Sequence, residues 1–258
     1  MTIKLPEQPQ NALQRPKLSL SWLFLVAAFA ATLFTAWTEP GMLPGELSAT
    51  VSTAFDFSST PEPQWPTATP RARLLVGIVA GHSGNDSGAV CPPELDNTRE
   101  VDVNLNVAER VRANLINLGV DAELLTEFDD RLKDYRANAL VSIHADSCEY
   151  INPQATGFKV APALSNLYPE QSQRLTNCLR ARYGEVTKML FHSGSITRDM
   201  TEYHAFGEIS KLTPAVIIEV GFLNLDYKIL KEQPDLLAQG VTQGILCFLK
   251  NEPVVAEK

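Results

Sequence analysis

Three apolar runs stand out along the chain beyond residue 73. Residues 74–80, 139–143 and 214–218 are almost entirely apolar, and each is bounded by polar or turn-forming residues. Runs of this length predict strands that are buried on both faces of a sheet. Shorter segments over 120–124 and 157–161 predict two further strands, the first from its alternation of apolar and polar residues.

The segments between these runs carry apolar residues at helical spacing. The pattern predicts a helix that opens near Asn97 and ends at Gly119, a short helix over 129–137, and helices over 169–183 and 234–250. Strands that alternate with helices predict an α/β fold. We expect one domain with a mostly parallel, twisted sheet of about six strands and helices on both faces.

The amino-terminal part of the chain has a different composition. Residues 18–37 form a 20-residue stretch without a charged side chain, long enough to span a bilayer as a helix, and Arg15 and Lys17 precede it. The positive flank predicts that residues 1–17 stay cytoplasmic. We favour an uncleaved transmembrane anchor over a cleaved signal peptide, because the apolar run is long for a signal peptide.

The remaining boundaries follow from composition. Residues 38–70 carry six prolines among Ser, Thr and Gly and predict an extended linker. The folded domain is then expected over 71–250, with a short tail over 251–258. An anchored chain would sit in the cell membrane with this domain outside the cytoplasm, whereas cleavage would release it as a secreted protein.

Charge limits the classes of partner. The 258-residue chain carries a formal net charge of −8, and it shows no basic stripe. This balance argues against a nucleic-acid partner, since nothing offsets the repulsion from phosphates.

Candidate chemistry lies where the predicted strands end. His82, His144 and Glu219 each follow an apolar run, and the carboxyl ends of parallel strands share one edge of a sheet. Glu100 lies in the first turn of the helix after the first strand, near the same edge. Asn97 and Glu100 have the spacing of a capping box, so Glu100 could instead serve only as a helix cap. Glu94 is a rival ligand, but it precedes the helical pattern.

Two imidazoles and a carboxylate form a donor set that suits a catalytic zinc ion with one open position. A second carboxylate nearby could act as general base toward a water molecule. The alternative, in which both histidines are ordinary core residues, is disfavoured because they occur as a pair together with Glu100 and Glu219.

At these residues the chain resembles the zinc-dependent N-acetylmuramoyl-L-alanine amidases of the amidase_3 family. The matching segments occur in the family's order and are IVAGHSG, REVDVNLNVAERVRANL, LVSIHADS, ATGFKV and TPAVIIEVGFLN. The resemblance implies that His82, Glu100 and His144 bind zinc and that Glu219 is the catalytic glutamate. It also implies hydrolysis of the amide bond between N-acetylmuramic acid and L-alanine in peptidoglycan. The chain departs from the family pattern at two positions. Ser83 stands where a second glycine is usual and Asp146 where an asparagine is common, but neither replaces a proposed ligand.

Two further histidines stay outside this proposed set. His192 and His204 are more often structural at such positions, although His204 could support the site by a hydrogen bond or contact substrate. Two other functions remain open: another zinc amidohydrolase or carboxypeptidase, and a metal-free peptidoglycan-binding or sensor module.

The four cysteines allow three pairings. Cys91 and Cys148 lie in loops at the same predicted sheet edge, so an exported domain could join them by a disulfide that braces the site loops. Cys178 and Cys247 lie on predicted helices and are expected to be buried small hydrophobic residues.

Overall fold

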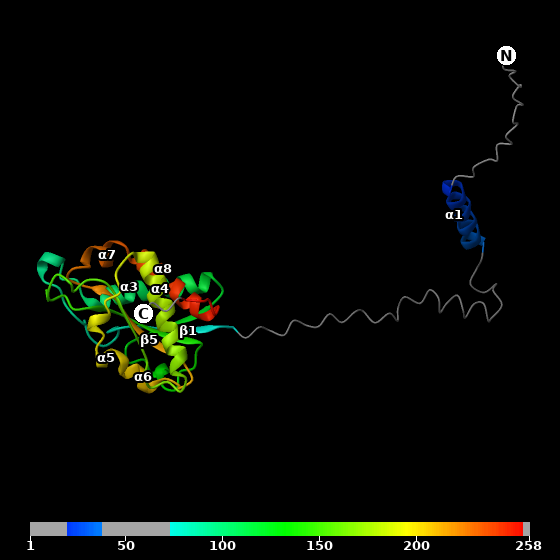
Figure 1. Ribbon diagram of the computed structural model, residues 1–258. Helices are drawn as coiled ribbons and strands as arrows, with labels where there is room; N and C mark the ends of the chain where they lie inside the picture. Colours follow the sequence, from blue (N-terminus) through cyan, green and yellow to red (C-terminus); the bar gives the residue numbers. More distant parts are fainter. Residues whose placement is uncertain (1–19, 38–72, 255–258) are drawn as a thin grey trace, which may run out of the picture. The chain divides into compact units, whose positions relative to one another are not determined.

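The computed structural model describes residues 20–37 and 73–254 (Figure 1). Contacts divide the chain into two units, 1–69 and 70–258, and the second contains the sheet. Its described residues form five strands and three long helices, and three of the strands follow one another without a long helix between them. They are β1 (Leu75–Ala80), α3 (Glu100–Asn117), β2 (Asp121–Leu125), β3 (Ala139–Asp146), β4 (Lys159–Pro162), α4 (Pro169–Thr187), β5 (Ala215–Phe222) and α8 (Pro234–Leu249).

Shorter elements fill the connections between them. They are the single 3-10 turns η2 (Pro93–Leu95), η3 (Asp130–Leu132) and η4 (Ser193–Ser195), and the helices α5 (Arg198–Thr201), α6 (His204–Glu208) and α7 (Tyr227–Glu232). The helix predicted over 129–137 is therefore wrong, because only three of its residues form a 3-10 turn.

The sheet has the strand order β2-β1-β3-β5-β4. The first four strands in this order run parallel, and β4 pairs antiparallel with β5 at one edge. The mostly parallel α/β fold is thus confirmed, but the described residues contain five strands instead of about six. All three apolar runs are strands at the centre of the sheet, where burial on both faces explains their lack of polar residues.

The two faces of the sheet are covered unequally. Helices α3, α4 and α8 enclose the larger core with Val76, Ile78 and Val141, while α5 and α6 cover the opposite face (Figure 1). That second face packs residues such as Phe206 against Leu140. Because side chains alternate along each strand, one apolar run supplies both cores.

The amino-terminal unit contains one described element, the 18-residue helix α1 (Leu20–Trp37). Over the described residues, no helix combines the length and apolar character needed to cross a membrane. The anchor predicted over 18–37 begins outside the described residues, gains no support from them and stays a prediction. The predicted cytoplasmic tail (1–17) and linker (38–70) lie outside the described residues.

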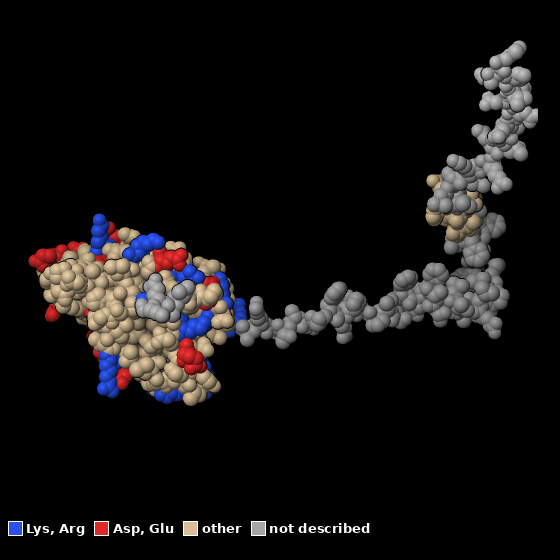
Figure 2. Space-filling view, viewed as in Figure 1, with Lys and Arg blue, Asp and Glu red and all other residues tan. Residues whose placement is uncertain are grey.

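Charged side chains of both signs occur on the visible face of the second unit. On the face drawn in Figure 2, Lys and Arg side chains are interspersed with Asp and Glu instead of gathering in one basic patch. The expectation that nucleic acid is not a partner stays a prediction.

Candidate metal centre

Neighbouring strands bring two histidines together. His82 lies two residues after β1, whereas His144 lies within β3, which continues to Asp146. Because β1 and β3 pair in parallel, with Ala80 opposite Ile143, the two rings meet with their centroids 5.2 Å apart. Gly81 makes this approach feasible, since a Cβ at that position would lie 2.3 Å from the His144 ring.

Glu100 reaches the same point from the first residue of α3. The predicted capping box is wrong, because the helix is capped by the backbone of Arg99, and Asn97 has a left-handed φ of 49°. The Glu100 backbone N–H donates to the Ala89 carbonyl, which leaves the Glu100 side chain free to point at the histidines. Glu94 lies in η2 and is exposed, so it stays out of this cluster.

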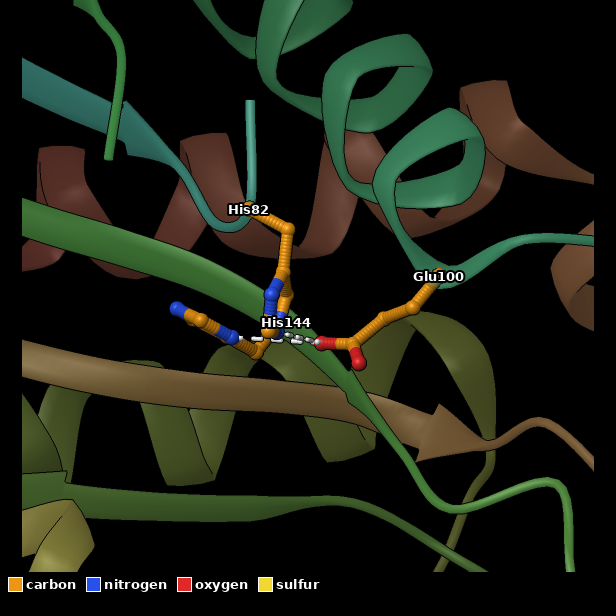
Figure 3. Close-up of side chains that lie close together, drawn as sticks. All are labelled: His82, Glu100 and His144. Carbon is orange, nitrogen blue, oxygen red and sulfur yellow. Dashed lines mark hydrogen bonds and ion pairs between the residues drawn. The ribbon is translucent and has the colours of Figure 1, made fainter. Parts of the chain in front are cut away.

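The three side chains form a compact donor set (Figure 3). Glu100 Oε1 lies 3.2 Å from His82 Nε2 and 3.2 Å from His144 Nδ1, and one potential ligand atom from each residue falls within 4.8 Å of the others. Tetrahedral ligands at zinc distances lie about 3.3 Å from one another. The described residues therefore fit a small tetrahedral metal ion, with one position left for a water molecule or substrate.

Hydrogen bonds hold Glu100 as a carboxylate. Its burial opposes ionisation, but the bonds to His144 and His82 and the Ala89 N–H hold its pKa well below the usual range. Asn104 donates to the same carboxylate from one turn further along α3, at 3.2 Å. Glu100 is therefore ready to bind a cation at neutral pH.

His82 is oriented from its other ring nitrogen as well. Its Nδ1 lies 2.6 Å from Asp86 Oδ1, an arrangement typical of metal-binding histidines. The hydrogen bond to Glu100, partly opposed by burial, raises the pKa of His82 to about 9 in the metal-free protein. A bound cation would have to displace this proton.

Glu219 lies on the strand beside His144. It belongs to β5 instead of following it, and the register pairs it directly with His144. Its Oε2 is buried without a hydrogen-bond partner within the described residues. Burial, with the nearby Glu100 carboxylate, raises its pKa to about 7. A carboxylate with a pKa near neutrality can take a proton from water and give it back.

All four side chains line one cavity of about 400 Å³. Across the sheet from Glu219, the buried Lys159 forms an ion pair with Asp146, and its ammonium group also lies 3.4 Å from the Ser195 carbonyl. Asp146 lines the cavity, which is rich in carboxylates, whereas Lys159 is not among the lining residues. This arrangement suits a metal ion in an open cavity that polar substrate groups can reach.

A family model for N-acetylmuramoyl-L-alanine amidases, amidase_3, matches residues 76–247, more than half of the chain. The chain belongs to the amidase_3 family. The matched region runs from β1 into α8 and includes every residue of the proposed donor set. The family resemblance stated on sequence motifs is therefore confirmed.

Individual relatives agree with this assignment. The amidase_3 chain is 38% identical over 104 residues to N-acetylmuramoyl-L-alanine amidase AmiA of Salmonella typhimurium, a match covering 37% of this chain and 34% of AmiA. It also resembles the solved amidase AmiC2 of Nostoc punctiforme (26% identity, TM-score 0.52, covering 69% of this chain and 97% of that one). An amidase from Clostridium difficile 630, at 24% identity and TM-score 0.55, shares the fold over 70% of this chain and 99% of that one.

The matched part thus spans about a third of the curated relative's length. The structural matches are longer, since they cover about 70% of this chain and nearly all of the two solved amidase chains.

Glu127 and His204 lie near the site but belong to none of the matching sequence segments. Glu127, beyond β2, accepts a hydrogen bond from the His82 backbone N–H, and His204 binds the same carboxylate. Periodicity gave no signal for Glu127, and His204 was expected at most to support the site. His192 is placed differently, since its ring binds Ser195 Oγ at 2.7 Å and does not line the cavity.

Both cysteine pairs form disulfides. Cys91–Cys148 confirms the expected pair and ties the loop around Ala89 to the end of β3. Cys178 and Cys247 are buried, as expected, but they also form a disulfide that was not expected, because α4 and α8 pack side by side and bring their Cα atoms to 5.7 Å. The described chain contains no free cysteine.

Proposed function

We propose that this protein is a zinc-dependent N-acetylmuramoyl-L-alanine amidase that hydrolyses the bond between N-acetylmuramic acid and L-alanine in peptidoglycan. The observation that carries the proposal is the donor set of His82, Glu100 and His144 beside the buried carboxylate of Glu219, in a chain of the amidase_3 family. Membership of the family supports the reaction, and the donor set supports the metal.

Zinc is the metal we assign, because two imidazoles and one carboxylate with an open fourth position are typical of catalytic zinc sites. Zinc there would supply Lewis acidity, polarising the amide carbonyl and making a water molecule acidic enough to react near neutral pH. The protein supplies the rest. Asp86 and Asn104 orient two of the three ligands by the hydrogen bonds described above.

Glu219 is assigned the proton transfers. Its carboxylate would accept the proton of the attacking water and then deliver it to the amino group of L-alanine as that group leaves. Its pKa of about 7 suits both directions of transfer, since neither protonation state is strongly favoured near neutral pH. The unpaired Oε2 is the atom available for this task.

The catalytic domain is proposed over residues 71–250, outside the cytoplasm. Two disulfides support this location, because disulfides persist mainly in oxidising compartments. Peptidoglycan in the cell envelope is the corresponding substrate.

The test is a digest of a purified muropeptide that contains the complete muramoyl–peptide linkage. We expect the full chain, loaded with zinc, to release the free peptide with an amino-terminal L-alanine, as measured by mass spectrometry. A chelator should abolish release, and zinc should restore it. Cleavage within the peptide would instead indicate a carboxypeptidase, and a chain that binds muropeptide without zinc or turnover would indicate a binding module.

A further inference from the structure

Glu127 occupies a central position in the site without being one of its proposed ligands. It follows β2 in the turn at the carboxyl edge of the sheet, and only 5% of the residue is exposed. A buried carboxylate is stable only where it is well paired. Its partners therefore indicate what holds it there.

The first partner is the backbone of the His82 turn. Glu127 Oε2 accepts the N–H of His82, and the Glu127 backbone N–H donates to the Ser83 carbonyl at 3.0 Å. His82 has a φ of 64°, a left-handed conformation that is uncommon for a residue other than glycine. Such a conformation persists when its surroundings fix it. Glu127 thus fixes the turn that aims the His82 ring at Glu100.

The second partner is the ring of His144. Its Nδ1 faces Glu100, whereas Nε2, on the opposite side, is buried without a hydrogen-bond partner and lies 3.8 Å from Glu127 Oε2. When one ring nitrogen of a histidine binds a metal, the other carries a proton and usually donates it to a carboxylate or carbonyl. Glu127 is the carboxylate placed to receive that proton after a small closing movement.

The third partner is His204 on α6. Its Nε2 lies 2.8 Å from Glu127 Oε1, and its ring stacks on Phe128 with the centroids 4.2 Å apart. The other ring nitrogen lies 3.3 Å from Glu208 Oε1. Glu127 Oε1, the oxygen turned away from the two histidine ligands, is therefore held by a residue of α6.

We propose that Glu127 is a positioning residue that orients both histidine ligands of the metal site and is itself held by His204. The inference rests on the metal binding that is part of the proposed function, but it adds a residue outside the donor set. The alternative is that Glu127 and His204 form a purely structural ion pair, which would stabilise the fold without affecting metal binding.

The decisive variant is Glu127→Gln. Glutamine keeps the shape but has only one acceptor oxygen. If that oxygen stays at the Oε2 position facing His82 and His144, it is uncharged and the NH2 group meets His204 Nε2, and if it turns toward His204, both ligand contacts lose their acceptor. Glu123→Gln is the matched control, because Glu123 lies on β2 and accepts a hydrogen bond from Tyr135 at 3.0 Å but contacts no ligand. Both variants are made in the full chain.

Zinc affinity is measured by competition with a chromogenic chelator, and the geometry of the site is followed by the visible absorption of bound Co²⁺. We expect Glu127→Gln to raise the zinc dissociation constant about 10- to 100-fold and to change the Co²⁺ spectrum. Glu123→Gln should leave both unchanged. A Glu127→Gln protein with wild-type affinity and spectrum but a lower melting temperature would overturn the proposal in favour of a structural ion pair.

A second variant covers the case in which Glu127→Gln does not fold. Glu127→Asp keeps the charge but is one methylene shorter, so it cannot reach the His82 turn and His144 together. We expect about tenfold weaker zinc binding, and unchanged binding would overturn the proposal. Neither readout depends on muropeptide cleavage. A wild-type chain that binds zinc but leaves muropeptide intact would refute the amidase activity and not this inference.

Discussion

His144 and Glu219 stand directly opposite each other in neighbouring parallel strands, β3 and β5. A proposed metal ligand and the proposed proton acceptor are thus fixed by one register of backbone hydrogen bonds. Their separation depends on the rigid centre of the sheet and not on a loop. The site can therefore be altered at one residue while the other keeps its place.

Glu219→Gln should separate metal binding from turnover. The amide is close in size to the carboxylate but cannot accept the proton of the attacking water, so we expect kcat to fall about 10²- to 10⁴-fold. Bound zinc, measured by atomic absorption, should stay at one equivalent. A variant with near-wild-type turnover would remove Glu219 from the proposed role.

Gly81→Ala should disturb the metal site through steric overlap. The new Cβ would lie 2.3 Å from the His144 ring, which is too close for any contact, so the ring must move. We expect weaker zinc binding and a loss of about 1–3 kcal/mol in the free energy of unfolding. The measurements are chelator competition and urea unfolding.

Gly207→Ala is the control for this substitution. It lies in the short helix α6, and a Cβ there would meet no atom within 4 Å. Its stability should be equal to or slightly above that of the wild type. Equal effects from the two substitutions would contradict the steric argument.

The two disulfides should differ in their effects on zinc affinity, although both should stabilise the fold. Replacing both Cys178 and Cys247 by alanine removes a link between α4 and α8, and we expect a loss of about 2–4 kcal/mol in the free energy of unfolding with unchanged zinc affinity. Replacing Cys91 and Cys148 should lower both quantities, because this bond holds the loop whose Ala89 N–H binds Glu100. Unchanged zinc affinity in the second double variant would show that the loop keeps its shape without the bond.

The zinc-free protein should lose stability as pH rises from about 4.5 to 9. The pKa of His82 is raised from 6.5 to about 9, so the folded state favours the protonated ring, and this contribution is complete below pH 6.5 and lost toward pH 9. Burial raises the pKa of Glu219 from 4.5 to about 7, so Glu219 adds a further loss of stability between about pH 4.5 and 7. Urea unfolding of chelated protein at several pH values measures the trend.

Two variants check the origin of this trend. His82→Gln should flatten the upper part of the profile, and Glu219→Gln should flatten the lower part. Zinc affinity should change in the opposite direction, increasing with pH as the competing proton leaves His82. Stability of the zinc-free protein that rises from pH 6.5 to 9 would contradict the assignment.

The sequence by itself determined the centre of the sheet and the edge at which the chemistry lies. Apolar runs long enough for strands buried on both faces are local features, and parallel strands must place their carboxyl ends together. For that reason the sequence alone predicts that His82, His144 and Glu219 lie at one edge of the sheet. Glu100 could be expected near the same edge because it opens the helix after the first strand, and only the alternative capping-box role was wrong.

The tertiary structure alone decided how these ligands are held. Glu127 and His204 are 77 residues apart and meet only because β2 and α6 pack around the same strand ends. The left-handed turn at His82 and the pairing of Cys178 with Cys247 likewise depend on neighbours distant in sequence. Periodicity records which face of an element is buried, whereas a buried hydrogen bond depends on two distant groups reaching each other within about 3 Å.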